Sequence, residues 1–288
     1  MRYVRVPLGL VIVAAAFGSA CRSDGEAPRT ETHAMPTAVT LTATDYEFEA
    51  PDTLQEGWTT FRFVNSGDAI HAALLVKLEE GRTLGEFRQA YAQALANGGP
   101  WDTMGLLGGI VGPMPQVGST NATLYLGAGH YAWYCPLGFD SGVPHLIAHD
   151  MARPFVVTQR GGSAPPTVAP EPSVSITMID YAFLLSAPLT AGQHLIHVEN
   201  QGPEPHELIL MMLAPEKTLE DVHTWLADFR SPPPFISSLG GVVIEEAGAE
   251  AYFEAELTPG NYVLFCIITA PDGRRHWEHG MVQQVRVD

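Results

Sequence analysis

Residues 266–281 read CIITAPDGRRHWEHGM, and residues 135–151 read CPLGFDSGVPHLIAHDM. Each stretch begins with a cysteine, contains two histidines and ends with a methionine. Thiolate, imidazole and thioether groups are the ligands that soft and borderline metal ions prefer. The same ligand types in the same order at two places indicate that the chain contains one pattern twice.

The repeat extends well beyond these two stretches. VNSGDAIH at 64–71 returns as ENQGPEPH at 199–206, DYEF at 45–48 returns as DYAF at 180–183, and LGGIV from Leu107 returns as LGGVV from Leu239. A chain of 288 residues has room for two domains. We expect these domains at residues 37–159 and 173–288, joined by a Pro/Ala-rich linker at 160–172 that reads RGGSAPPTVAPEP.

The apolar segments of each repeat are short and rich in Val, Leu, Tyr and Phe, with turn residues between them, as in TTFRFVN and HLIHVEN. This pattern is typical of an antiparallel sandwich. Thr83-x-x-Glu86 and Thr218-x-x-Asp221 predict helix N-caps, followed by apolar residues at helical spacing. We therefore predict an all-β fold of two tandem Greek-key β-sandwiches, each with one inserted α-helix. Four aromatic residues of the opening strands are expected in the cores: Tyr46, Phe48, Tyr181 and Phe183.

The N-terminus predicts export. Residues 1–21 carry two arginines, then a short apolar stretch, then small residues before Cys21. The ending GSAC resembles a bacterial lipobox, which implies a lipid on Cys21, a tether at 22–36 and a periplasmic or cell-surface protein anchored to a bacterial membrane. An ordinary cleaved signal is the alternative.

The net charge argues against one class of partner, and the cysteine positions argue against a disulfide. The formal net charge is −17, so nucleic acid is a poor partner. Cys135 and Cys266 occupy equivalent positions in separate repeats. That placement argues against a disulfide, which would require the two positions to meet.

A copper electron-transfer site needs two imidazoles and a thiolate in one plane, with a long thioether contact on the axis. His71 and His206 end their N-x-G turns and are placed to supply an imidazole from a distant strand. These turns, followed by Y-x-x-(Y/F)-C and then by His and Met, resemble the cupredoxin family of plastocyanin, azurin and the copper nitrite reductases. The resemblance implies cupredoxin-like domains with one or two type 1-like copper ions. The implied ligands are His206, Cys266, His276 and Met281 in the second domain, which is favoured, and His71, Cys135, His145 and Met151 in the first.

Two further histidines leave the ligand choice open. His149 and His279 each lie two residues before the methionine, and on an extended strand they would point the same way as it. We favour His145 and His276, because a loop apex would let the imidazole reach the metal.

The resemblance implies an exported protein that passes single electrons by cycling Cu(II) and Cu(I), with a redox partner such as a cytochrome or a membrane oxidoreductase. Copper storage or delivery, and a metal-free binding or scaffold lipoprotein, are the alternatives. The copper enzymes of the family place a histidine directly beside the ligand cysteine. Here the neighbours are Tyr134 and Pro136, and Phe265 and Ile267, so we predict that the chain is not an enzyme.

Overall fold

The computed structural model describes residues 34–97, 106–112, 118–138, 142–162, 167–229 and 231–288, without the side chains of residues 106 and 107. The predicted signal, the lipidation residue Cys21 and most of the tether lie outside the described residues. Within the described ranges, none of the helices has the length and apolar character needed to cross a bilayer.

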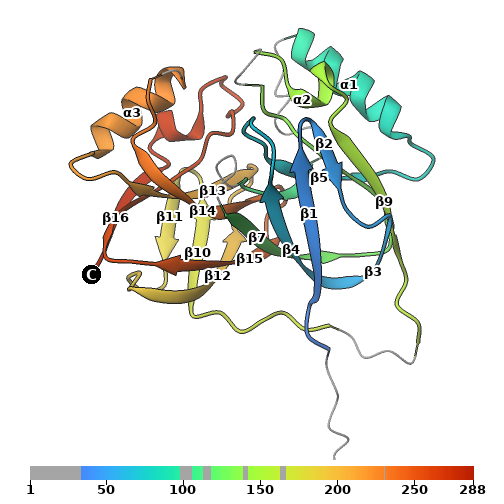
Figure 1. Cartoon of the computed structure of the whole chain (residues 1–288), viewed down its shortest axis with the longest axis horizontal. Helices are drawn as coiled ribbons and strands as arrows, with labels where there is room; N and C mark the ends of the chain where they lie inside the picture. Colours follow the sequence, from blue (N-terminus) through green and yellow to red (C-terminus); the bar gives the residue numbers. More distant parts are fainter. Residues whose placement is uncertain (1–33, 98–105, 113–117, 139–141, 163–166, 230) are drawn as a thin grey trace, which may run out of the picture. The chain divides into compact units, whose positions relative to one another are not determined.

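Strands dominate both halves of the chain (Figure 1). The first half contains β1 (Thr37–Thr44), β2 (Glu47–Glu49), β3 (Thr53–Gln55), β4 (Gly57–Asn65), β5 (Ala73–Leu78), α1 (Leu84–Ala96), β6 (Leu106–Ile110), β7 (Ser119–Leu126), β8 (Gly129–Tyr134), α2 (His145–Ala148) and β9 (Ala152–Thr158). The second half contains β10 (Val174–Ile179), β11 (Ala182–Leu185), β12 (Gly192–Asn200), β13 (His206–Leu213), α3 (Leu219–Asp228), β14 (Phe235–Ile244), β15 (Glu250–Leu257), β16 (Gly260–Phe265), the 3-10 helix η2 (His276–His279) and β17 (Val282–Val287).

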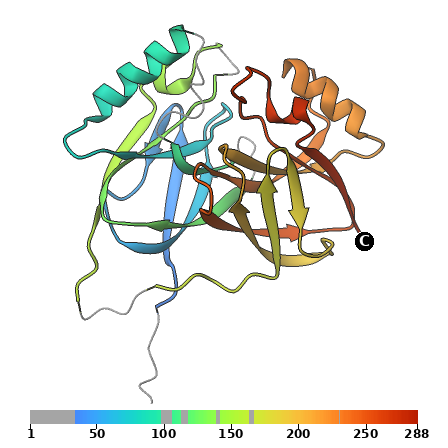
Figure 2. The same cartoon turned by 180° about the vertical axis from the view of Figure 1, so that it is seen from behind.

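The strands form two sheets, and each half contributes to both. One sheet has the order β11-β10-β12-β15-β7-β4-β1-β2, and the other has the order β17-β16-β13-β14-β6-β5-β8-β9-β3. In the views from the front and from behind, α1 and α3 lie at the same end of the strands as α2 and η2 (Figures 1 and 2). The predicted all-β fold is confirmed, with the addition that both sheets run from one half into the other.

The inserted helices begin where the sequence predicts. Oγ1 of Thr83 accepts a hydrogen bond from the backbone N–H of Glu86 at 3.2 Å, and the Glu86 carboxylate accepts one from the N–H of Thr83 at 2.8 Å. At α3 the Asp221 carboxylate accepts from the N–H of Thr218 at 2.9 Å. These bonds satisfy backbone donors that have no partner inside a helix, so both N-termini are defined by short-range chemistry.

The two halves join through β6 and β14 in one sheet and through β7 and β15 in the other. Ile110 pairs with Val242 in the first junction, and Thr123 pairs with Tyr252 in the second. The side chain of Asn121 strengthens the second junction, because it accepts from the N–H of Glu254 at 2.7 Å and donates to the carbonyl of the same residue at 2.9 Å.

The repeated Leu-Gly-Gly motif lets β6 and β14 lie close to the other strand that pairs with each of them, β5 and β13. A Cβ atom added to Gly109 would lie 2.9 Å from the carbonyl oxygen of Ala73 on the neighbouring strand. Gly241 has φ +139°, and an added Cβ would collide with the carbonyl oxygen of Leu208. Only glycine allows these backbones to approach so closely, so the motif permits the sheet to continue.

Candidate metal centres

The first candidate centre forms where three elements of the first half meet. His71 precedes β5, Cys135 directly follows β8, and His145 is the first residue of α2. Sγ of Cys135 lies 3.8 Å from Nδ1 of His71 and 3.5 Å from Nδ1 of His145, and the two Nδ1 atoms are 3.2 Å apart. The three side chains are at most 1% exposed.

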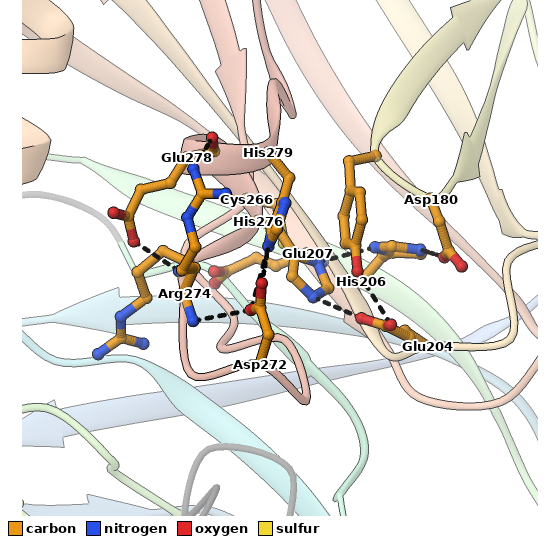
Figure 3. A network of polar contacts seen from close by, with 12 residues as sticks. Asp180, Glu204, His206, Glu207, Cys266, Asp272, Arg274, His276, Glu278 and His279 are labelled. Carbon is orange, nitrogen blue, oxygen red and sulfur yellow. Dashed lines mark hydrogen bonds and ion pairs between the residues drawn. The ribbon is translucent and has the colours of Figure 1, made fainter.

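The second centre repeats this arrangement (Figure 3). His206 is the first residue of β13, Cys266 directly follows β16, and His276 is the first residue of η2. Nδ1 of His276 lies 3.4 Å from Sγ of Cys266 and 3.1 Å from Nδ1 of His206. All three side chains are fully buried. The backbone N–H of Glu207 donates to Sγ of Cys266 at 3.2 Å, a bond that favours a thiolate.

The donor atoms fit a single metal ion in both centres. In a trigonal plane with bonds of about 2.0 Å to nitrogen and about 2.3 Å to sulfur, two nitrogens are about 3.5 Å apart and nitrogen and sulfur about 3.7 Å apart. The five separations of 3.1–3.8 Å lie close to these values, and the ligand atoms of His206 and Cys266 lie within 4.8 Å of each other. Two imidazole nitrogens with lone pairs facing each other at 3.1 Å repel, and a shared cation or proton removes that repulsion.

Met151 and Met281 are placed by the backbone next to the other three residues. The N–H of Cys135 donates to the carbonyl of Met151 at 3.2 Å, and the N–H of Met151 donates to the carbonyl of His145 at 3.1 Å. In the second half the corresponding bonds join Cys266 to Met281 at 3.1 Å and Met281 to His276 at 3.0 Å. Both methionines are buried, and a thioether contact to a metal stays a prediction.

His149 and His279 lie outside the two groups of converging ligand atoms. The ring of His149 stacks on Tyr46 with centroids 3.7 Å apart, and the ring of His279 stacks on Tyr181 at 4.5 Å. His149 follows the last residue of α2 and His279 is the last residue of η2. The next residues, Asp150 and Gly280, have φ of 58° and 106°, so neither stretch is the extended strand on which the histidine and the methionine would point the same way. His145 and His276 are the first residues of α2 and η2, where the sequence predicted a loop apex.

Comparison with known proteins gives likenesses among solved structures only. Neither a protein-family model nor a curated protein matches the chain. Auracyanin A, a blue copper protein from Chloroflexus aurantiacus, is 22% identical, with 43% of this chain and 99% of that chain covered and a TM-score of 0.30. A multicopper oxidase is 12% identical over 87% of this chain and 88% of that chain, with a TM-score of 0.24. A copper-containing nitrite reductase from Thermus scotoductus is 12% identical over 88% of this chain and 62% of that chain, with a TM-score of 0.23.

These likenesses correct one prediction. The sequence predicted that the chain is not an enzyme, because no histidine adjoins Cys135 or Cys266. The similar structures include a multicopper oxidase and a nitrite reductase, which are enzymes, so that prediction is contradicted. A histidine beside the ligand cysteine is only one way to build a catalytic copper centre, so its absence at Cys135 and Cys266 does not exclude catalysis.

Two tyrosines of the opening strands border the centres, which the sequence analysis missed. Phe48 and Phe183 are buried in the core as predicted. Tyr46 and Tyr181 are only half-buried, and their rings stand edge-on to His145 and His276 with centroids 4.8 Å and 4.9 Å away. The sequence does contain a sign of this placement, because the Asp-Tyr pair recurs at the same distance before the first histidine in both halves.

Carboxylates face both imidazoles of the second centre on the side away from the thiol (Figure 3). Oδ1 of Asp180 is 2.7 Å from Nε2 of His206, and Oε2 of Glu204 is 3.1 Å from Nε2 of His276. The hydroxyl of Tyr181 donates to Oε1 of Glu204 at 3.0 Å. A carboxylate at Nε2 favours a proton on that nitrogen and leaves the Nδ1 lone pair for a metal.

Burial lowers the pKa of both imidazoles in the second centre. Desolvation lowers the pKa of His276 to about 4, and the nearby His206 adds to the effect. Desolvation also lowers the pKa of His206, against the opposing influence of Asp180. Both imidazoles are therefore neutral at pH 7 and need not lose a proton to become ligands. Partial burial and Glu204 raise the pKa of Tyr181 to about 12, so its hydroxyl remains a donor.

Proposed function

We propose that the chain is a copper protein that binds one type 1-like ion in each half and transfers single electrons. The observation that carries the proposal is the convergence of one buried thiol and two buried imidazole Nδ1 atoms, built twice from the same elements. This donor set suits copper, because thiolate favours Cu(I) and imidazole accepts Cu(II).

In this proposal the protein contributes a rigid and buried framework for the copper ligands. Copper, when bound, supplies a one-electron couple between Cu(II) and Cu(I). The N–H of Trp277 donates to the carbonyl of Cys266 at 3.0 Å, and the N–H of Leu146 donates to that of Cys135 at 3.0 Å. Together with the bonds to the methionine backbones, these bonds connect the cysteine, the second histidine and the methionine within one loop. The first histidine comes from elsewhere: His206 begins β13, and His71 lies just before β5. A framework that cannot relax keeps the geometry similar in both oxidation states.

The remaining parts of the proposal concern location and partner. We infer an exported protein, lipid-anchored at Cys21, from the N-terminal sequence. A net charge of −17 favours a basic redox partner, whose association would be fast at low ionic strength and would slow as salt is added.

A copper titration tests the function. Purified apoprotein receiving Cu(II) is expected to develop an intense visible charge-transfer band from thiolate to copper, at two copper ions per chain. Cys135→Ser and Cys266→Ser should each remove about half of the band, and the double variant should stay colourless. His149→Ala and His279→Ala are the matched controls and should keep the band. A colourless wild-type protein with both thiols titratable would instead support the metal-free scaffold, and rapid transfer of Cu(I) to a chelator would support storage or delivery.

A further inference from the structure

We propose that Glu204 is a positioning residue that fixes the tautomer of His276 and lowers the reduction potential of the second centre. The inference rests on the proposed copper function and deepens it, because it assigns the two centres different potentials. Glu204 would act through His276 and does not itself belong to the ligand set.

The backbone of the preceding turn holds Glu204 in place. The side-chain amide of Asn200, which is fully buried, donates to the carbonyl of Glu204 at 2.8 Å and accepts from the N–H of Gly202 at 2.9 Å. Prolines at 203 and 205 restrict the backbone on both sides. The hydroxyl of Tyr181 donates to Oε1 of Glu204 at 3.0 Å, which leaves Oε2 of the same carboxylate 3.1 Å from Nε2 of His276.

The first half builds the same turn with a different side chain. Asn65 donates to the carbonyl of Ala69 at 2.8 Å and accepts from the N–H of Gly67 at 3.1 Å. Residue 69 is therefore the spatial equivalent of residue 204, and it is an alanine. The first half has no carboxylate at this position of the turn, so Glu204 is a difference between the two centres.

A carboxylate beside the outer nitrogen of a metal-binding histidine has a defined effect. It accepts the Nε2 proton, orients the ring and increases the electron density at Nδ1. The added negative charge stabilises Cu(II) more than Cu(I), because Cu(II) carries the larger charge. The side chain of Glu204 is 21% exposed, so water screens only part of this interaction.

Reduction potentials of single-centre proteins test the inference. In the Cys135→Ser background, Glu204→Ala is expected to lower Cu(II) affinity about 10- to 100-fold with little change for Cu(I). That difference corresponds to a rise in potential of about 59 to 118 mV, at about 59 mV per tenfold for one electron. Glu204→Gln, which keeps a hydrogen-bond acceptor without the charge, should give a smaller rise. In the Cys266→Ser background, Ala69→Glu should lower the potential of the first centre.

A second readout needs no copper. Nitrogen NMR of the apoprotein should show His276 protonated on Nε2 in the wild type and in Glu204→Gln, and a mixture of tautomers in Glu204→Ala. Urea unfolding of the same proteins shows whether any loss merely reflects a damaged fold.

The outcomes separate this inference from the proposed function. A wild-type protein without the thiolate-to-copper band overturns the copper function, and the apoprotein tautomer then still decides whether Glu204 positions His276. A wild-type protein with the band, but with unchanged potential and tautomer in Glu204→Ala, overturns this inference alone. Equal losses of Cu(I) and Cu(II) affinity would also overturn it, because a purely structural residue produces that result.

Discussion

Gly202→Ala should damage the second centre while sparing the fold. An added Cβ would lie 2.6 Å from Nε2 of His206 and against Oδ1 of Asp180, so the two groups must separate. Separation removes their 2.7 Å bond, and hydrogen bonds to charged groups contribute about 1.5–3 kcal/mol. At about 1.4 kcal/mol per tenfold, Cu(II) affinity at this centre should fall about 10- to 150-fold.

The assay is a Cu(II) titration in the Cys135→Ser background, followed through the thiolate band. Gly162→Ala serves as the control, because an added Cβ there meets nothing within 4 Å. The unfolding free energy of the apoprotein should fall by about 0.5–2.6 kcal/mol, because the lost bond costs about 1.5–3 kcal/mol and alanine at an ordinary φ restores about 0.4–1 kcal/mol by reducing the freedom of the unfolded chain. Unchanged copper affinity in Gly202→Ala would refute the reasoning, because it would mean that Asp180 does not orient His206.

Three further predictions concern stability. Gly241→Ala places a side chain at φ +139° and against Leu208, so urea unfolding should show a loss of at least about 1–3 kcal/mol, with Gly162→Ala again as the control. Burial raises the pKa of Glu245 from 4.5 to about 7, so the folded state holds a proton that the unfolded state releases. The unfolding free energy should therefore fall as pH rises from about 4.5 through about 7. Glu245→Gln should flatten that part of the stability profile, and an equal slope in the variant would contradict the assignment. Thr83→Ala removes a helix cap and should cost about 0.5–2 kcal/mol by the same assay, whereas a neutral result would show that α1 does not depend on its cap.

Much of the fold was predictable because it depends on local chemistry and on repetition. The capping residues Thr83 and Thr218 start helices through bonds to residues three positions away, which a sequence displays directly. The convergence of His206, Cys266 and His276 followed from a family resemblance, and the structure brings these residues together. Their role as copper ligands stays a prediction, as do the two domain boundaries.

Other features depend on contacts between distant segments. Nothing local to Glu204 shows that its carboxylate reaches His276, which lies far along the chain. The tyrosines at 46 and 181 look like ordinary strand residues until the loops that carry the histidines pack against them. The Leu-Gly-Gly motif does not itself show which backbone comes close, because the carbonyls of Ala73 and Leu208 that face Gly109 and Gly241 belong to other strands.

The pairing of β6 with β14 relates the two halves by symmetry. Ile110 faces Val242, and these two residues occupy the same position of the repeated motif. In an antiparallel ladder, a residue that meets its own equivalent lies on a two-fold axis, as at the contact of an isologous dimer. The register of β6 and β14 therefore relates the two halves by a pseudo-two-fold axis, as two identical subunits are related in such a dimer. A half expressed alone would expose that strand edge and recruit a second copy of itself through it.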